Sequence, residues 1–340
     1  MENEKRFLNF YGITVSVCGD KEIVSKLACD FGFFLTQEQT DEKIKLNIKF
    51  AQPPYERLNN LTASTYKTDC ICYDYKSIRY VDYNKQCLCI YDKKEFSAEV
   101  YSLSKDLLYE ISYLFIHSRV GELLDLKGFH RIHACAFSYE GYAYVLMLPQ
   151  GAGKSTFLFD LLKRNDIKLL SDDTPMIDSS AKLYPFPIRI GLCNDIDTSS
   201  IPKEYIYTFK RKNFGDKKLL AYDYFKNSIE NKNLPVKLIY GKRIFSQKAE
   251  IKKKNKLVIL KELFTNCIIG YGLPQLLEYF LTGGLKDIFV KIYIVLLRTY
   301  SCIVLLLKCK GAYCFYLSNN ITQNSEEFLN FFKKINYENY

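Results

Sequence analysis

A short glycine-rich run constrains the fold of this 340-residue chain more than any other feature. Residues 151–156 read Gly-Ala-Gly-Lys-Ser-Thr and follow an apolar stretch that ends at Leu148. Glycines let backbone N–H groups approach phosphate oxygens, and a helix that starts directly after them favours anions at its N-terminus. The run therefore predicts a strand, a phosphate-binding loop and a helix in that order, as in a Walker-type nucleotide site.

Each position of the loop has an expected part in such a site. Lys154 would reach the β- and γ-phosphates, and the hydroxyl of Ser155 would bind Mg²⁺. The full pattern has a glycine where this chain has Leu148, which bears on the geometry of the loop. A glycine-rich turn with a chance Lys-Ser is the alternative. The residues expected to line the nucleotide phosphates are Gly151, Ala152, Gly153, Lys154, Ser155 and Thr156.

Two adjacent carboxylates follow at a matching distance. Asp172 and Asp173 stand eighteen and nineteen residues after Lys154, directly after the apolar stretch 167–170. A Walker-B carboxylate belongs there, on the strand beside the phosphate loop, where it approaches Mg²⁺. One carboxylate of such a pair can hold the ion while the other accepts a proton from an attacking hydroxyl. A turn or a helix cap is the alternative for the pair, but the preceding loop favours the metal site.

His133 is the third candidate, on the strand expected before the loop, twenty-one residues upstream of Lys154. An imidazole at that place could tune a neighbouring carboxylate. By itself a single histidine is more often a satisfied core or surface residue.

These features together resemble the catalytic domain of HPr kinase/phosphorylase. The matching residues are His133-Ala134, then Leu146 with Gly151–Thr156, then 170–173, which read Leu-Ser-Asp-Asp. More closely, the chain is similar to the HPr-kinase-related proteins of peptide-modification gene clusters, such as lasso-peptide kinases. The strong part of the resemblance covers residues 128–192, and a weaker part continues through the strand expected at 234–245 to the terminal helix.

The resemblance implies roles for these residues. Asp172 would be the base that activates an acceptor hydroxyl, Asp173 would help to hold Mg²⁺, and His133 would support the carboxylate pair. Arg189 and Arg243 are weak candidates for the basic residue that binds phosphate or acceptor in the family. The Arg-Gly-rich signature of true HPr kinase/phosphorylases has no counterpart here, so the resemblance implies neither HPr as substrate nor the phosphorylase reaction.

The expected fold class is α/β, with a P-loop nucleotide-binding domain like those of HPr kinase and phosphoenolpyruvate carboxykinase. Residues 1–98 read as a small mixed α/β domain with strands near 13–17, 43–50, 70–75, 77–83 and 87–91 and a helix near 22–31. Residues 99–340 read as the catalytic domain, with helices near 102–126 and 154–164 and strands near 142–148 and 167–170.

The later half of the chain gives weaker signals. Residues 198–233 are polar and lysine-rich, which favours a long surface loop. Helices are expected over 257–266, 274–280 and 325–334 and a strand over 236–244. The very apolar stretch 288–307 reads as a helix that ends near Tyr300, followed by a buried strand 302–308 paired with 312–317.

Charge and cysteine content bear on the cellular location of the protein and on the state of its cysteines. Lys291 and Arg298 interrupt the apolar stretch, and a charge near the middle of a membrane span costs about 2.5–3.5 kcal/mol, so we expect no membrane partner. The N-terminal residues lack a signal-peptide pattern, so we expect a cytoplasmic protein whose twelve cysteines are mostly thiols. The two Cys-x-Cys pairs, at 70/72 and 87/89, are expected to be buried in strands; a zinc site is the alternative.

The expected function is therefore an ATP- and Mg²⁺-dependent kinase. It would phosphorylate a hydroxyl, such as Ser or Thr of a peptide or protein, with a precursor peptide as one candidate acceptor. The alternative is an inactive nucleotide-binding or peptide-binding scaffold of the same fold. The net charge of +10 also allows a DNA-binding ATPase, but the scattered charge carries no nucleic-acid motif, so no nucleic acid is expected. A homo-oligomer is compatible with the resemblance.

Overall fold

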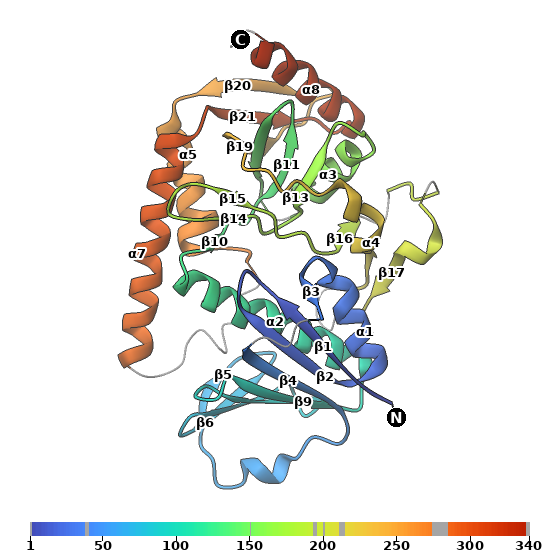
Figure 1. Cartoon of the computed structure of the whole chain (residues 1–340), viewed down its shortest axis with the longest axis vertical. Coiled ribbons are helices and arrows are strands. Elements are labelled where there is room, and N and C mark those ends of the chain that lie inside the picture. The colour runs from blue at the N-terminus through green and yellow to red at the C-terminus, as the bar shows by residue number, and fades with distance from the viewer. Residues whose placement is uncertain are drawn as a thin grey trace. The chain divides into compact units, whose positions relative to one another are not determined.

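The chain forms two compact units of mixed α/β structure. The computed structural model describes residues 2–37, 41–149, 151–192, 196–199, 201–210, 215–273 and 285–337, and Figure 1 labels their helices and strands. The first unit comprises Met1–Leu124, Thr208–Lys217 and Pro274–Lys291, and the second comprises Asp125–Tyr207, Lys218–Leu273 and Ile292–Tyr340. The first unit continues through Leu124, whereas a boundary after residue 98 would cut a strand, β9, in two.

A nine-stranded sheet forms the centre of the first unit, with the strand order β3-β1-β2-β4-β9-β8-β7-β6-β5. The pairs β2–β4 and β4–β9 are parallel and the other neighbours are antiparallel, so the expected meander occupies one end of the sheet. The strands are β1 (Asn3–Asn9), β2 (Thr14–Asp20), β3 (Leu35–Thr36), β4 (Glu42–Phe50), β5 (Ala63–Tyr66), β6 (Ile71–Tyr75), β7 (Ile78–Asp82), β8 (Cys87–Asp92) and β9 (Ser97–Ser102).

Two helices cover this sheet. Helix α1 (Lys21–Asp30) begins where the Asp20 carboxylate accepts hydrogen bonds from the N–H groups of Glu22 and Ile23, at 3.1 and 3.4 Å. Helix α2 (Lys105–Leu126) stacks Tyr113 on Phe31, with ring centroids 5.2 Å apart. Short 3₁₀ turns occupy Gly32–Phe34 (η1) and Tyr55–Leu58 (η2). Helices were expected near both α1 and α2, and both predictions are confirmed.

All four cysteines of the Cys-x-Cys pairs are buried, as expected. Cys72, Cys87 and Cys89 lie in strands, whereas Cys70 directly precedes β6. Cys72 on β6 and Cys89 on β8 both lie opposite Val81 of the intervening strand β7, so two strand spacings separate them. Among the described residues, no group of three or more His, Cys, Asp or Glu side chains could hold a metal ion. The positions of these cysteines therefore suit packing in the sheet.

A six-stranded mixed sheet forms the centre of the second unit, with the strand order β13-β11-β12-β19-β21-β20. Strands β12, β19 and β21 are parallel to one another, and β11 pairs antiparallel with both β12 and β13. The strands are β11 (Cys135–Tyr139), β12 (Tyr142–Met147), β13 (Lys168–Ser171), β19 (Val236–Arg243), β20 (Glu250–Lys254) and β21 (Ala312–Leu317). The expectation that the carboxylate strand lies beside the loop strand is therefore wrong, because β11 lies between β12 and β13.

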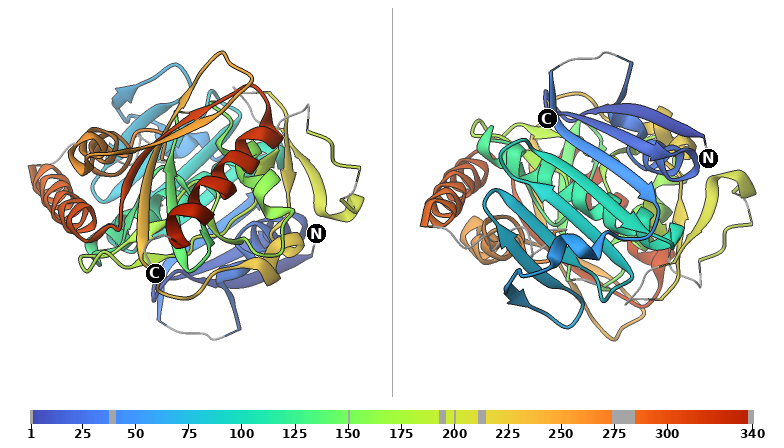
Figure 2. Two further views of the ribbon diagram at one scale, coloured as in Figure 1. Left: turned by 90° about the horizontal axis from the view of Figure 1, so that it is seen from above. Right: turned by 90° about the horizontal axis from the view of Figure 1, so that it is seen from below.

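Helices cover both faces of this sheet, as Figure 2 shows from above. On one face, α3 (Lys154–Leu162) and α8 (Ile321–Tyr337) enclose an aromatic cluster that includes Phe137, Phe157 and Phe328. On the other face, α5 (Lys256–Leu263) and α7 (Leu285–Lys308) belong to one buried apolar core with Val145 and Leu238. Successive residues of a strand point to opposite faces, so each strand serves both cores.

Short elements complete the described fold. Three-stranded sheets have the orders β10-β14-β15 and β16-β18-β17, and a π-helical segment η5 (Phe264–Ile269) continues α5. The remaining elements are β10 (His130–Arg131), β14 (Met176–Ile177), β15 (Leu183–Tyr184), β16 (Ile190–Leu192), β17 (Ile206–Phe209), β18 (Lys217–Leu220), α4 (Tyr222–Phe225), η3 (Lys203–Tyr205) and η4 (Lys226–Ser228).

Two expectations for the later half are wrong. Residues 302–308 are not a strand but the last turns of α7, because Cys302, Leu305, Leu306 and Cys309 are buried at helical spacing. The partners of β21 are β19 and β20. The expected loop 198–233 contains β17, β18 and α4, in which Leu219, Leu220 and Phe225 are buried. The helix expected at 274–280 lies outside the described residues.

Helix α7 is long and apolar enough over Asp287–Lys308 to meet the length and composition of a membrane span, with a third of its apolar window buried in the fold. Its two charges have partners within the protein. Lys291 donates to Glu122 at 2.7 Å, and the Arg298 guanidinium pairs with the buried Asp125 carboxylate. Both charged side chains of this apolar helix are therefore paired with acidic side chains of the folded protein.

Candidate functional site

The loop between β12 and α3 has the backbone of a phosphate cradle. Gly151 and Gly153 have φ angles of 77° and 92°, and a Cβ atom built on either would meet no atom within 4 Å. These left-handed conformations favour glycine. Gly153 is the N-cap of α3, and no side chain caps that helix. An uncapped helix N-terminus leaves N–H groups that an oxyanion can accept from. Gln150 lies outside the described residues.

Leu148 does not occupy this cradle. Its side chain is buried, and it lies over Gly241 of β19 so closely that a Cβ atom on Gly241 would be 2.3 Å from Leu148 Cδ2. Glycine at 241 therefore makes room for the leucine in the sheet. The leucine that departs from the full loop pattern is therefore packed in the core and does not contact the Cβ positions of Gly151 and Gly153.

The structure brings the loop and the two carboxylates together. The Ser155 hydroxyl donates to Asp172 Oδ2 at 3.0 Å, and Lys154 Nζ lies 2.6 Å from Asp173 Oδ1. Asp172 is buried, whereas 35% of the Asp173 side chain is exposed. Although β11 separates β12 from β13, the residues after both strands meet at the same edge of the sheet because the two strands run in the same direction.

Hydrogen bonds hold the turn that carries the carboxylates. The Ser171 hydroxyl donates to the carbonyl of Phe186 at 2.9 Å and accepts from the N–H of Thr174 at 3.0 Å. The N–H of Ala134 donates to the carbonyl of Asp173 at 3.2 Å. The backbone of Asp172 and Asp173 is thus held on both sides, which limits where their side chains can point.

The charge of Asp173 is strongly favoured. Burial raises the pKa of this carboxyl, but the Lys154 ammonium and the His133 ring outweigh burial and hold the pKa well below its ordinary value. Cys135 lies close enough to feel the same charges. Burial raises the pKa of its thiol, against the lowering effect of Lys154. The site therefore holds an ionised Asp173 next to a neutral thiol.

His133 lies beside the pair, although not on a strand as expected. It occupies a bend between β10 and β11, and its Nε2 is 3.3 Å from Asp173 Oδ1. The backbone N–H of His133 donates to the carbonyl of Asn266 at 2.9 Å. Gly272, with φ +86°, lies so close that an added Cβ atom would be 2.4 Å from His133 Nδ1. The segment around η5 thus determines both the backbone and the ring position of His133.

A buried ion pair anchors this segment. Arg298 on α7 donates through Nε to Asp125 Oδ1 at 2.9 Å and through a terminal nitrogen to Oδ2 at 2.5 Å. It also donates to the carbonyls of Cys267 and Ile268 in η5, each at 3.3 Å. His130 Nδ1 lies 2.9 Å from Asp125 Oδ1. Since Asn266 belongs to η5, this network supports the residue that holds His133.

The two arginine candidates lie at or next to the ends of strands β16 and β19. Arg189 is buried just before β16, which packs on α3. Arg243 ends β19 and donates to the carbonyl of Ser318 at 2.7 Å. The C-terminal ends of β19 and β12 lie at the same edge of the sheet, so Arg243 is on the loop side. Its role remains a proposal.

The donor set suits magnesium. The oxygens of Ser155, Asp172 and Asp173 are hard donors, and Mg²⁺ commonly takes one or two carboxylates together with water and substrate phosphates. The three oxygen-bearing side chains here agree with the small number of protein ligands that Mg²⁺ commonly uses. The left-handed glycines of the loop and the Ser155–Asp172 hydrogen bond are features that a site for a nucleotide with its metal ion requires.

Sequence reasoning missed the support of His133. Gly270 and Gly272, two glycines with positive φ close together, were a detectable signal for a constrained turn. Arg298 within an apolar stretch was interpreted only as an argument against a membrane span, whereas it also signalled a buried acidic partner. Neither signal indicates His133 as the neighbour, because that contact depends on the tertiary fold.

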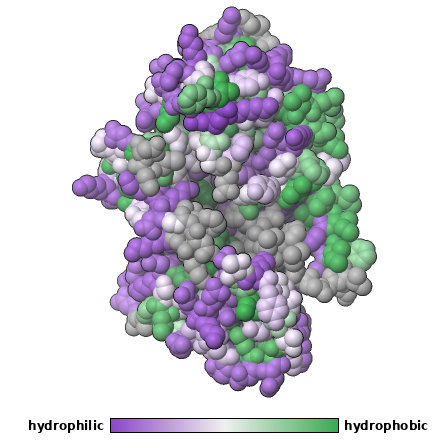
Figure 3. Space-filling model, turned by 180° about the vertical axis from the view of Figure 1, so that it is seen from behind, coloured by the Kyte–Doolittle hydropathy of each residue, from purple (hydrophilic) through white to green (hydrophobic). Residues whose placement is uncertain are grey.

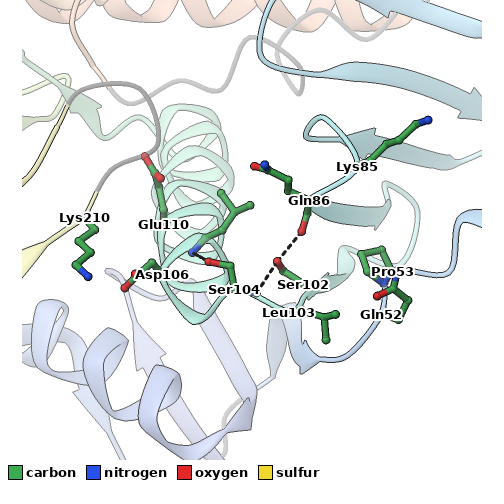
Figure 4. Close-up of a pocket in the computed structure, with 11 residues that line it drawn as sticks. Gln52, Pro53, Lys85, Gln86, Ser102, Leu103, Ser104, Asp106, Glu110 and Lys210 are labelled. Carbon is green, nitrogen blue, oxygen red and sulfur yellow. Dashed lines mark hydrogen bonds between the residues drawn. The ribbon is translucent and has the colours of Figure 1, made fainter.

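A separate hollow of about 520 Å³ lies in the first unit and contains none of the expected site residues. Figure 4 shows its walls, which come from the start of α2, the turn at Lys85-Gln86, the loop at Gln52-Pro53 and Lys210. Ser102 donates to the carbonyl of Gln86 at 2.6 Å and joins two of these walls. The hollow is lined by both lysines (Lys85, Lys210) and carboxylates (Asp106, Glu110), which favours no single class of ligand.

No family model and no curated protein matches this chain.

Proposed function

We propose that this protein is an ATP- and Mg²⁺-dependent kinase that transfers phosphate to a hydroxyl, such as Ser or Thr of a peptide or protein. The observation that carries the proposal is the meeting of Lys154 and Ser155 with Asp172 and Asp173 at one edge of the sheet. The resemblance to HPr-kinase-related proteins supports the same reading and suggests a P-loop fold of that type. A cytoplasmic setting and a precursor peptide as acceptor remain parts of this proposal.

Each group would act by its position. The N–H groups of the loop and the Lys154 ammonium stabilise charge on the transferring phosphoryl group. A bound Mg²⁺ would neutralise the phosphate oxygens. One carboxylate accepts the proton of the acceptor hydroxyl, and His133 orients that carboxylate through its 3.3 Å contact with Asp173.

The contacts favour roles for the two carboxylates that are the reverse of those predicted from the sequence. Asp172 is hydrogen-bonded to Ser155, whose hydroxyl is the expected metal ligand, so Asp172 suits the metal. Asp173 is the more exposed of the two and lies next to His133, so it suits the acceptor hydroxyl. The assignment of Asp172 as base and Asp173 as metal ligand stays a prediction that the same variants test.

The test compares Lys154→Ala, Asp172→Asn and Asp173→Asn with the unchanged protein. Transfer of label from γ-labelled ATP to Ser/Thr peptides and binding of Mg²⁺-nucleotide are measured for each. We expect Asp173→Asn to lower transfer at least about 100-fold with nucleotide binding nearly unchanged, and Asp172→Asn to weaken Mg²⁺-dependent binding. Asp166→Asn is the control, because Asp166 is half exposed and pairs only locally with Arg164.

The outcomes separate the alternatives. If Asp172→Asn abolishes transfer and leaves Mg²⁺-dependent binding intact, the sequence-based assignment of Asp172 as base is the better one. Nucleotide binding without transfer to any acceptor would favour the inactive scaffold. Absence of nucleotide binding in the unchanged protein would refute both readings.

A further inference from the structure

Helices α5 and α7 expose an unusual number of large apolar side chains on the second unit. Between Ile292 and Leu307, every exposed residue of α7 is apolar or tyrosine. Figures 1 and 2 show α5 and α7 next to each other, and Figure 3 shows hydrophobic side chains along that border of the molecule. The apolar face consists of Ile292, Tyr293, Val295, Leu296, Tyr300, Ile303 and Leu307 of α7 and Leu257, Val258, Leu260 and Phe264 of α5.

Between Ile292 and Leu307 the outer side of α7 carries no exposed charge, whereas α5 exposes Lys261 between Leu260 and Phe264. Arg298 points inward to Asp125 and to the carbonyls of η5, and Lys291 pairs with Glu122. Helix α7 is also part of the buried core through Cys302 and Leu305. Its outer face is therefore a surface of a folded helix, and the buried ion pair opposes any rearrangement that would draw the helix out to span a bilayer.

The spacing of the protruding residues suits another helix. Tyr293, Leu296, Tyr300, Ile303 and Leu307 follow each other at intervals of three, four, three and four residues. This alternation is the repeat of helices that pack side by side with interlocking side chains. Binding to a lipid surface does not require this spacing of three and four residues.

The area is sufficient for a stable interface. The side chains of the apolar face are each 39–72% exposed. At roughly 150–250 Å² for a large side chain, the face offers on the order of 900 Å² per chain, near the ~800 Å² per partner of a standard interface. The largest apolar patch of an ordinary monomer covers about 300–600 Å². The protein carries a net charge of +10, yet the α7 helices of two copies can meet between Ile292 and Leu307 without opposing like charges.

We propose that the apolar face of α5 and α7 is the interface of a homodimer, in which the same face of a second copy covers it around a two-fold axis. Because α7 exposes only apolar and tyrosine side chains between Ile292 and Leu307, the α7 surfaces of two copies are complementary to each other. The proposal is independent of the kinase activity.

The experiment measures the mass of the full-length protein in solution by light scattering and sedimentation. We expect twice the chain mass of 39.8 kDa for the unchanged protein. The double variant Leu296→Glu/Ile303→Glu should raise the dissociation constant of the dimer at least 100-fold, because it places like charges in the seam, and circular dichroism should be unchanged since both residues are exposed. Phe245→Glu is the matched control, because Phe245 is fully exposed just after β19, outside both helices.

Three results would overturn the proposal. The first is a monomer of 39.8 kDa for the unchanged protein at micromolar concentration. The second is a dimer that the double variant leaves intact. The third is a monomer that floats with anionic phospholipid vesicles through the same two residues, which would assign the face to a membrane surface.

Discussion

Lys237 is the buried group whose titration most clearly reports the packing of the second unit. It is 2% exposed on β19, its ammonium lies 3.8 Å from the centroid of the Tyr142 ring, and it donates a hydrogen bond to Asn336 Oδ1. The rings of Tyr144 and Phe332 also face it, at 5.8 and 5.4 Å. Burial lowers the pKa of Lys237 from 10.5 to about 8, with a smaller contribution from Lys253.

The sign of the pH dependence follows from the two pKa values. At pH 7 both the folded and the unfolded chain carry the proton, and the folded state bears the full cost of the buried charge. As pH rises through 8 the folded state releases the proton, whereas the unfolded state keeps it until about 10.5. The Lys237 contribution to the free energy of unfolding therefore rises by about 2 kcal/mol between pH 7 and pH 9.5, within the limit of 1.36 kcal/mol per pH unit.

The assay is urea unfolding followed by far-ultraviolet circular dichroism, because the chain has no tryptophan. The unchanged protein and Lys237→Met are compared at pH 7 and pH 9.5, so that the titration of tyrosines and other lysines cancels in the difference. The unchanged protein should gain about 2 kcal/mol relative to the variant over this range. An identical pH dependence of the two proteins would refute the reasoning and show that the ammonium is solvated in the folded state.

Two further substitutions test the support of the site. Arg298→Met should lower the free energy of unfolding by about 3–5 kcal/mol because it leaves the Asp125 carboxylate buried without its main partner, and adding Asp125→Asn should recover part of that loss in thermal unfolding. Gly272→Ala should lower phosphoryl transfer more than nucleotide binding, because its Cβ would press on the His133 ring. Gly128→Ala is its matched control, since Gly128 has a similar φ of +82° but no atom near an added Cβ. Equal effects of the two alanines on transfer would show that backbone strain, and not contact with His133, is responsible.

Local patterns predicted the elements that depend on local chemistry. The strand–loop–helix around Gly151–Thr156 follows from residues close in sequence. The alternation of apolar residues likewise placed β4, and helical spacing placed α2.

Features that depend on distant neighbours could not be predicted in this way. The apolar stretch 302–308 fits a strand or a helix equally well, and only its burial against the sheet decides for α7. The insertion of β11 between β12 and β13 is a matter of sheet order, which spacing along the chain does not encode. The contact of Gly272 with His133 joins residues 139 positions apart.

The central claim is tested most directly by transfer of label from γ-labelled ATP, with Mg²⁺, to a Ser- or Thr-containing peptide, for the unchanged protein and for Lys154→Ala. We predict labelled peptide with the unchanged protein and at least about 100-fold less with the variant, because Lys154 stabilises the transferring phosphoryl group. Tight binding of ATP without label in any acceptor, or equal transfer by both proteins, would contradict the assignment of this site as that of a kinase.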